Sequence, residues 1–153
     1  MEPSPTSPPL RVLAADDHPT NRLVVETILG LVSAEVTSVE DGAQALQAVE
    51  AAGPSSYDVI LMDLQMPVMD GLEATRRIRA LEAAAGAPRT PLLVVTANTM
   101  TEHLEAAMAA GADAHMAKPV TPDGLLGAIG RTMALVAATA RGAAPSPAGQ
   151  IQV

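Results

Sequence analysis

Cysteine, phenylalanine and tryptophan are all absent from this 153-residue sequence, which contains a single tyrosine. The lack of cysteine excludes disulfides, thiolate metal sites and cysteine nucleophiles, and it permits a reducing compartment. Because large aromatic side chains are almost missing, a hydrophobic core must be built from Ala, Val, Leu, Ile and Met on closely packed helix faces. Hydrophobic residues make up 48% of the chain, which is enough for such a core, and the length suits one domain.

Basic residues are scarce as well, with 9 Lys and Arg against 17 Asp and Glu, giving a formal net charge of -8. This balance argues against direct nucleic-acid binding, because Lys and Arg neutralise phosphates, and it suits a protein that binds a cation or a basic partner surface. The start of the chain has no basic and apolar segments typical of a secretory signal. The longest apolar helical stretch, 125–140, is interrupted by Arg131 and is shorter than the roughly 20 residues of a membrane span. We therefore expect a cytoplasmic protein without membrane insertion.

The two ends of the chain differ from its middle. Residues 1–9 contain four prolines and are expected to be a disordered N-terminus, and residues 141–153 are expected to be a disordered C-terminal tail. Between them, residues 10–140 alternate short apolar runs with amphipathic segments. This alternation predicts one α/β domain, a doubly wound five-stranded parallel sheet flanked by five helices, with right-handed crossovers.

The expected strands are four buried apolar runs and one less regular edge strand: 12–15, 59–62, 91–95 and 114–117, with the edge strand at 34–39. The expected helices are amphipathic stretches at 21–31, 43–52, 71–85, 101–110 and 122–140. We expect Thr20 to cap the first helix, with Val24, Ile28 and Leu31 facing the core, and Thr99 or Thr101 to cap the fourth. The solvent face of the third helix carries a basic group, namely Arg76, Arg77 and Arg79.

Polar residues follow four of the five expected strands. Asp16 and Asp17 follow the first strand, Asp63 the third, Thr96 the fourth and Lys118 the fifth. In a parallel sheet these strand ends lie at one edge, where open α/β sheets bind their ligands. Three close carboxylates repel one another unless a cation lies among them, and oxygen ligands suit Mg²⁺. The arrangement suits a phosphoryl group held on Asp63, with Mg²⁺ and Lys118 neutralising its charge.

These motifs resemble those of the receiver domains of two-component response regulators, a CheY-like superfamily with a flavodoxin-like (βα)5 fold. The matching segments are Asp16-Asp17, Met62-Asp63-Leu64-Gln65-Met66-Pro67-Val68-Met69-Asp70-Gly71, Thr96-Ala97 and Lys118-Pro119. Each motif alone is weak, but all four in order after alternate elements are specific. The resemblance covers about residues 11–140. In motif the chain is similar to the receivers of hybrid histidine kinases and to single-domain response regulators.

The resemblance implies a role for each acidic residue. Asp63 would be the phosphoacceptor. Asp16 and Asp17 would hold Mg²⁺, one directly and one partly through water, together with Asp63 and the backbone carbonyl of Gln65. Mg²⁺ is therefore the expected cofactor.

The resemblance also implies roles around the phosphoryl group. Thr96 would donate a hydrogen bond to a phosphoryl oxygen and move toward it. Lys118 would bridge phosphoryl and carboxylate, and Pro119 would follow it through a cis peptide bond. Gln65 and Asn98 occupy positions at which family members tune dephosphorylation.

One position departs from the family pattern. Members usually place Tyr or Phe three residues before the lysine, where the ring swings inward as the threonine moves, but this sequence has His115. Histidine is smaller and titrates near neutrality. Two interpretations stay open: His115 couples to Thr96 in a modified way, or it is a passive, half-exposed residue.

The phosphoryl group must come from a partner, because the sequence has neither a P-loop nor a kinase signature. By resemblance, the donor is a phosphohistidine on a histidine kinase or a histidine phosphotransfer protein, docked on the first helix and the loops around Asp63 and Lys118. Phosphorylation would then switch contacts with a downstream protein target. Such a domain promotes its own phosphorylation and slow dephosphorylation, but it is not an enzyme in the ordinary sense.

Several alternatives remain beside a single-domain response regulator. The first is a receiver domain that belongs to a hybrid histidine kinase. The second is an aspartyl-phosphate phosphatase, which usually needs a second Asp two residues after the first, where this chain has Gln65. The third is a pseudo-receiver that binds partners without phosphorylation, although all five site side chains are present.

Overall fold

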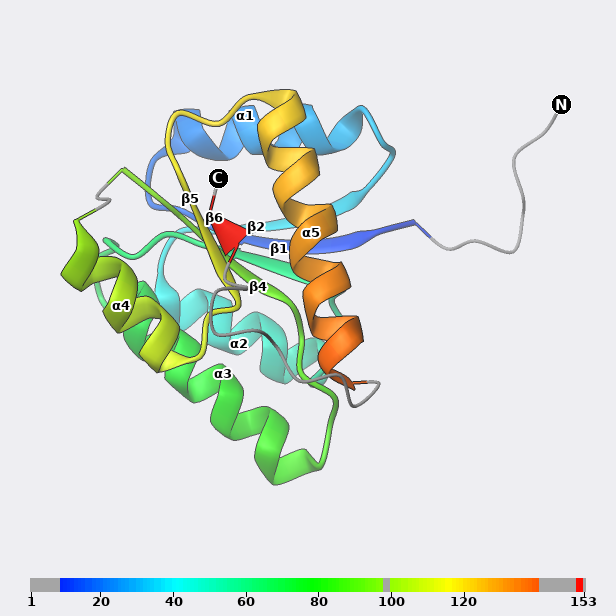
Figure 1. The fold of residues 1–153 in the computed structure, drawn as a ribbon, viewed down its shortest axis with the longest axis vertical. Helices are drawn as coiled ribbons and strands as arrows, with labels where there is room; N and C mark the ends of the chain where they lie inside the picture. Colours follow the sequence, from blue (N-terminus) through cyan, green and yellow to red (C-terminus); the bar gives the residue numbers. More distant parts are fainter. Residues whose placement is uncertain (1–8, 98–99, 141–150, 153) are drawn as a thin grey trace, which may run out of the picture.

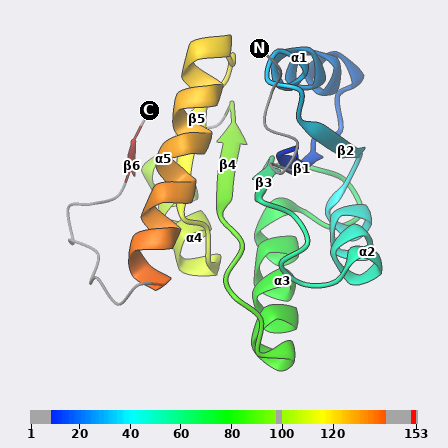
Figure 2. The same cartoon turned by 90° about the vertical axis from the view of Figure 1, so that its right-hand side faces the viewer.

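The computed structural model describes residues 9–97, 100–140 and 151–152. Its strands are β1 (Arg11–Ala15), β2 (Glu35–Val39), β3 (Val59–Met62), β4 (Leu92–Thr96), β5 (Ala114–Ala117) and β6 (Ile151–Gln152). Its helices are α1 (Pro19–Gly30), α2 (Gly42–Ala52), α3 (Gly71–Ala85), α4 (Thr101–Ala110) and α5 (Pro122–Ala140). The strands form one parallel sheet (Figure 1), in the order β2-β1-β3-β4-β5-β6 (Figure 2). The predicted sheet of five parallel strands with five helices is confirmed, and short β6 adds a sixth strand at its edge.

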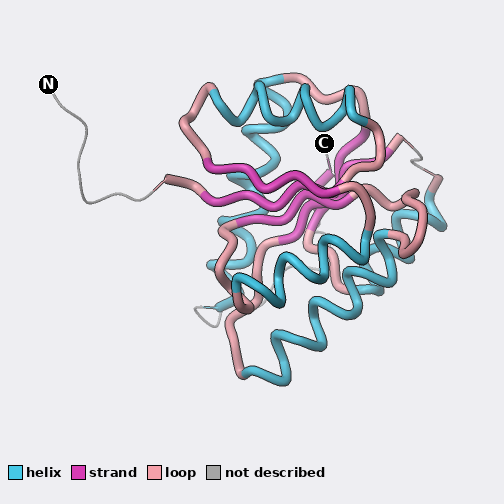
Figure 3. Tube along the Cα trace, turned by 180° about the vertical axis from the view of Figure 1, so that it is seen from behind, coloured by secondary structure: helices cyan, strands magenta, loops and turns pink. Residues whose placement is uncertain are grey.

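Helices cover both faces of the sheet, as Figures 2 and 3 show. Successive residues of a strand point to opposite faces, so Val12 and Ala14 of β1 pack in one cluster with α1 and α5, whereas Leu13 and Ala15 pack in another with α2, α3 and α4. All of β3 and β4 is buried. Strands covered on both faces need continuous apolar residues, which is why these runs were recognisable in the sequence.

Helix α1 differs from the prediction at its start and in its buried face. It begins at Pro19 with His18 as the N-cap residue and no side-chain cap, so the prediction that Thr20 caps it is wrong. Proline suits this first position because its fixed backbone angle is already helical. The buried side chains are those of Val25, Ile28 and Leu29.

Two of the three residues predicted to face the core from α1 are exposed instead: Val24 is 37% exposed and Leu31 is 67% exposed. Apolar residues occur on more than one side of this helix, so periodicity alone could not identify the packed side. Helix α4 also starts without a side-chain cap, with Met100 at its N-cap and Thr101 as its first residue. Thr99, the other predicted cap, lies outside the described residues.

The segments beyond the sheet and helices are only partly described. In the C-terminal segment predicted as a disordered tail, Ile151 and Gln152 pair with Ala114 and His115 of β5. Residues 1–8, 141–150 and 153 lie outside the described residues, so the predicted domain boundaries stay predictions. Among the residues that the structure does describe, no helix has the length and apolar character needed to cross a membrane.

A buried ion-pair network is centred on Arg79 of α3. Arg79 of α3 donates to Glu82, to Asp113 and to the backbone oxygens of Thr90 and Gly111, at 2.8–2.9 Å. The Arg79 side chain is only 13% exposed, so its placement on the solvent face of α3 is wrong. The network joins α3 to the segments that precede β4 and β5.

Candidate functional site

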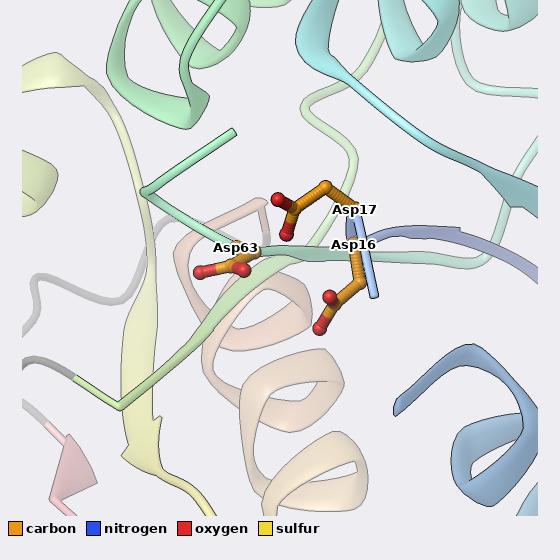
Figure 4. Close-up of side chains that lie close together, drawn as sticks. All are labelled: Asp16, Asp17 and Asp63. Carbon is orange, nitrogen blue, oxygen red and sulfur yellow. The ribbon is translucent and has the colours of Figure 1, made fainter. Parts of the chain in front are cut away.

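The acidic residues meet because β1 and β3 are neighbours in the sheet. Ala15 of β1 is paired with Met62 of β3, so the next residues, Asp16 and Asp63, emerge side by side. The Asp63 N–H donates to the carbonyl of Ala15 at 3.1 Å. Carboxylate oxygens of Asp16, Asp17 and Asp63 all lie within 4.8 Å of one another (Figure 4). The predicted acidic cluster therefore forms at the carboxyl edge of the sheet.

Lys118 reaches the same cluster from the end of β5. Its Nζ lies 2.6 Å from Asp16 Oδ2 and 3.2 Å from Asp63 Oδ2. Its backbone N–H donates to the carbonyl of Thr96 at 3.0 Å, which ties the ends of β4 and β5 together. The Lys118–Pro119 peptide bond is cis, as predicted.

The cluster has fewer positive than negative charges. Burial raises the pKa of Asp63 above its ordinary value, and the charge of Asp16 adds to this rise although Lys118 opposes it. Burial lowers the pKa of Lys118, but its hydrogen bonds and attraction to Asp16 and Asp63 outweigh that effect and leave the pKa raised. Three carboxylates thus face one ammonium group. Hard oxygen donors with excess negative charge fit a divalent cation such as Mg²⁺.

The start of α1 holds Asp16 in place. The His18 N–H donates to Asp16 Oδ1 at 2.9 Å, and Asn21 Nδ2 approaches the same oxygen at 3.4 Å. Arg22 Nη1 donates to the Asp16 carbonyl at 2.7 Å. Sequence reasoning missed Asn21 and Arg22. The signal available was their position in the first turns of the helix that follows the acidic pair.

The loop after Asp63 folds back tightly on the sheet. Gly71 donates its N–H to the carbonyl of Leu64 at 3.0 Å, and a Cβ at Gly71 would collide with the Asp63 carbonyl. Asp70 then caps α3 by accepting the Glu73 N–H at 3.0 Å. The Asp-Gly pair is needed here because only glycine allows this close approach.

Val68 lies at the tip of this loop in a left-handed conformation, with φ of 69°. The Met69 N–H donates to the Pro67 carbonyl at 2.7 Å, an i to i+2 bond that closes a γ-turn around Val68. Positive φ is unfavourable for a β-branched residue. The loop that follows the candidate acceptor is therefore held under backbone strain.

The other predicted site residues lie around the cluster. The exposed Gln65 donates its backbone N–H to Asp63 Oδ1 at 3.3 Å. Thr96 is the last residue of β4 and is buried. His115 is half-buried in β5, where burial lowers its pKa. Both interpretations of His115, a modified coupling to Thr96 and a passive residue, stay open. Asn98 lies outside the described residues.

Comparisons with known proteins agree with this geometry. The family model of the response regulator receiver domain matches residues 12–130. The sensor protein GacS of Pseudomonas syringae pv. syringae is 40% identical over 111 residues, which cover 72% of this chain but only 12% of that protein. The chain thus spans a small part of this curated relative.

Two solved receiver domains are similar in structure. The receiver of the sensor histidine kinase PA1611 from Pseudomonas aeruginosa, solved with a magnesium ion in its active-site cleft, is 35% identical with a TM-score of 0.72. The match covers 83% of this chain and 99% of that one. The Saccharomyces cerevisiae Ssk1 receiver, solved with the phosphotransfer protein Ypd1, shares the fold at a TM-score of 0.75 and 24% identity, over 84% and 91% of the two chains. The chain therefore belongs to the response regulator receiver domain family, whose members act in two-component phosphorelays.

Proposed function

We propose that Asp63 accepts a phosphoryl group from a phosphohistidine, with Mg²⁺ held by Asp16, Asp17, Asp63 and the backbone carbonyl of Gln65. The observation that supports this most directly is the cluster itself, three carboxylates within 4.8 Å of one another in contact with one lysine. The known magnesium site of the PA1611 receiver adds support for the choice of cation.

In the proposed reaction, one Asp63 oxygen attacks the phosphorus atom. The phosphorus–nitrogen bond of the phosphohistidine breaks, and its electron pair goes to the imidazole nitrogen, which takes a proton from solvent. Mg²⁺, when bound, would neutralise negative charge on the phosphoryl oxygens. Lys118 is placed to bind the negatively charged phosphoryl oxygens because its Nζ already contacts Asp63. The Thr96 hydroxyl would donate a hydrogen bond to another phosphoryl oxygen. This interaction would change the contacts that the domain makes with a downstream protein.

The partner would dock beside this site on α1. Exposed apolar side chains occur along and just after this helix, with Leu23 62% and Leu31 67% exposed. Apolar exposure next to a reactive site is typical of an interaction surface. We infer that a histidine kinase or phosphotransfer protein lays a helix bearing its histidine across this surface. The solved complex of the Ssk1 receiver with the histidine phosphotransfer protein Ypd1 supports a partner of this class.

The similarity to a much longer sensor protein is compatible with a receiver within a hybrid histidine kinase, and the single-domain response regulator stays beside it as a prediction. The native mass in cells distinguishes the two. An immunoblot band several times heavier than 15.6 kDa would support the hybrid kinase. A band at that mass would support the single-domain protein.

The phosphoacceptor is tested by incubating the protein with Mg²⁺ and acetyl phosphate and measuring intact mass. We expect a gain of one phosphoryl group that is labile in base and absent in Asp63→Asn. The exposed Asp123→Asn serves as a matched control and should gain the group normally. Phosphorylation that persists in Asp63→Asn would contradict the assignment. Steady release of phosphate from a phosphomonoester would instead support the phosphatase alternative.

A further inference from the structure

A cavity of about 130 Å³ lies between α1 and the sheet, next to the acidic cluster. Its apolar walls come from β1, α1, β3, β4 and the segment before α5: Ala14, Val24, Val25, Leu61, Val95 and Val120. At its polar end it is bounded by residues of the proposed phosphorylation site, including Asp16 and Lys118. The apolar part continues from this end over the face of the sheet covered by α1 and α5.

The cavity exists because the side chains around it are small. Ala14 occupies the β1 position beneath α1, and the surrounding strand and helix positions hold mainly Val. The sequence contains no Phe or Trp that could fill the space. The space opens to solvent beside the exposed Val24 and Pro119, so it is a pocket and not a sealed void. A space of this size next to the acidic cluster is therefore a candidate binding site.

The basic groups at the polar end already have hydrogen-bond partners. Lys118 bonds to Asp16 and Asp63, and Arg22 donates to the Asp16 carbonyl. Within the part of the chain that the structure describes, no buried side-chain nitrogen or oxygen lacks a hydrogen-bond partner. The apolar walls away from this end carry no charged group with which an ionic ligand could pair, and apolar walls hold water poorly. The chemistry favours a neutral, largely apolar occupant.

We propose that this cavity is a binding site for a small neutral molecule with a single ring. The size is appropriate, because an apolar cavity of about 150 Å³ in another protein binds benzene. Entry does not require unfolding, since the lining includes the exposed residues Val24 and Pro119. A ring placed here would contact Val24 and Val25 of α1 on one side and Leu61 and Val95 of the sheet on the other.

Such an occupant would be linked to the proposed phosphorylation site, because the aliphatic stem of Lys118 and the ring of Pro119 are part of the same lining. This linkage rests on the proposed function, whereas binding itself does not. Linkage is reciprocal, so a ligand that changes the affinity for Mg²⁺ must have its own affinity changed by the same factor.

The binding site is tested with benzene as the probe, added to the purified chain without Mg²⁺ while methyl resonances are recorded by NMR. We expect saturable shifts confined to methyl groups around the cavity, at Val24, Val25, Leu61, Val95 and Val120. Shifts that are absent, or that spread over the exposed Leu23 and Leu31, would overturn the proposal.

Substitutions in the wall give a second readout. Ala14→Val adds two methyl groups to the cavity and should weaken benzene binding at least tenfold. Ala34→Val makes the same change at a partly buried position packed on the same cluster but outside the cavity, and it should leave binding unchanged. If Ala14→Val does not fold, Val24→Phe at the exposed rim replaces it, with the exposed Val32→Phe as its control. Equal binding by a wall variant and its control would contradict the site.

The linkage is tested by repeating the titration with saturating Mg²⁺. We expect the benzene affinity to change at least twofold, with the same factor in Mg²⁺ affinity when benzene is present. A benzene affinity that is the same with and without bound Mg²⁺ would contradict the linkage but not the binding site in the cavity. Absence of Mg²⁺ binding itself would contradict the proposed function instead.

Discussion

Lys118 Nζ lies closer to Asp16, at 2.6 Å, than to Asp63, at 3.2 Å. The ammonium group is thus held mainly by a proposed metal ligand and only secondarily by the proposed phosphoacceptor. A cation at the cluster would need the same Asp16 carboxylate, so we expect Lys118 and Mg²⁺ to compete for it. Their competition would release the lysine toward Asp63 when the metal binds.

Removing the lysine charge should therefore strengthen metal binding. We expect Lys118→Met to raise the affinity for Mg²⁺ by about tenfold or more, since a unit positive charge within a few ångströms is lost. The same variant should lose the partner response to phosphorylation. Isothermal titration calorimetry measures the affinity, and Lys118→Arg, which keeps the charge, is the matched control. An unchanged affinity in Lys118→Met would contradict the competition.

Asp17 is the most accessible member of the cluster to test as a metal ligand, because it is more exposed than Asp16 or Asp63. At a Mg²⁺ concentration about 100 times the dissociation constant, the wild-type unfolding free energy should rise by about 2.7 kcal/mol. Asp17→Asn should lose most of this gain while unfolding normally without Mg²⁺. Thermal unfolding with and without Mg²⁺ measures both. A full gain in Asp17→Asn would place the metal elsewhere.

The pKa of Asp63 predicts how stability depends on pH. Burial raises this pKa, so the folded state binds the proton more tightly than the unfolded state does. The contribution of Asp63 to stability is complete below the ordinary pKa of 3.8 and is lost as pH rises through the higher folded value. Asp63→Asn, which is neutral throughout, should therefore have a higher Tm than wild type at pH 7 but not below that ordinary pKa.

Differential scanning calorimetry at the two pH values checks this expectation, with Asp123→Asn as the exposed control. The titration of Lys118 affects stability in a different pH range. Its contribution is present below its ordinary pKa of 10.5 and is lost only as pH rises through its raised folded value. A lower Tm for Asp63→Asn at pH 7 would show that the lost contact with Lys118 outweighs the relief of burial.

The strained turn after Asp63 predicts a stabilising substitution. Val68 has φ of 69° and is 85% exposed, so its side chain contributes little packing. Val68→Gly should raise the unfolding free energy by about 1 kcal/mol, because glycine adopts positive φ without steric cost. Urea unfolding measures the change. Val68→Ile keeps the branched side chain and should show no gain; similar gains in both variants would exclude strain as the cause.

The buried Arg79 network predicts a large loss of stability remote from the acidic cluster. Arg79→Ala leaves the carboxylates of Glu82 and Asp113 buried without this partner and should cost about 3–5 kcal/mol. Arg77→Ala, on the same helix but in an exposed pair with Glu73, should cost less than about 1 kcal/mol. Chemical denaturation compares them. Equal losses would mean that burial of the network is not what stabilises it.

Much of the site could be predicted from the sequence because polar residues follow buried apolar runs. Asp63 and Lys118 were recognisable since each ends a short strand, and parallel strands bring such ends to one edge. The starts of α2 and α3 were predicted to within one residue, but their caps were not: Asp41 and Asp70 accept the N–H groups of Gln44 and Glu73. These features depend on local spacing and residue type, which a sequence contains in full.

Other features depend on contacts between distant segments. The buried side of α1 could not be chosen from periodicity because Leu23, Val24 and Val25 are all apolar, and only packing on the sheet and α5 selects Val25. The burial of Arg79 depends on Asp113, which is 34 positions away along the chain.

Alternating apolar and amphipathic segments permit few arrangements other than a parallel sheet, so the succession of strands and helices and the residues at the carboxyl edge follow from the local pattern of the chain. Three features follow instead from packing between elements: Lys118 bonds Asp16 more closely than Asp63, Arg22 anchors the acidic loop, and a cavity remains beneath α1. Distances and voids arise from side chains of different elements meeting in space, and no local pattern along the chain encodes them.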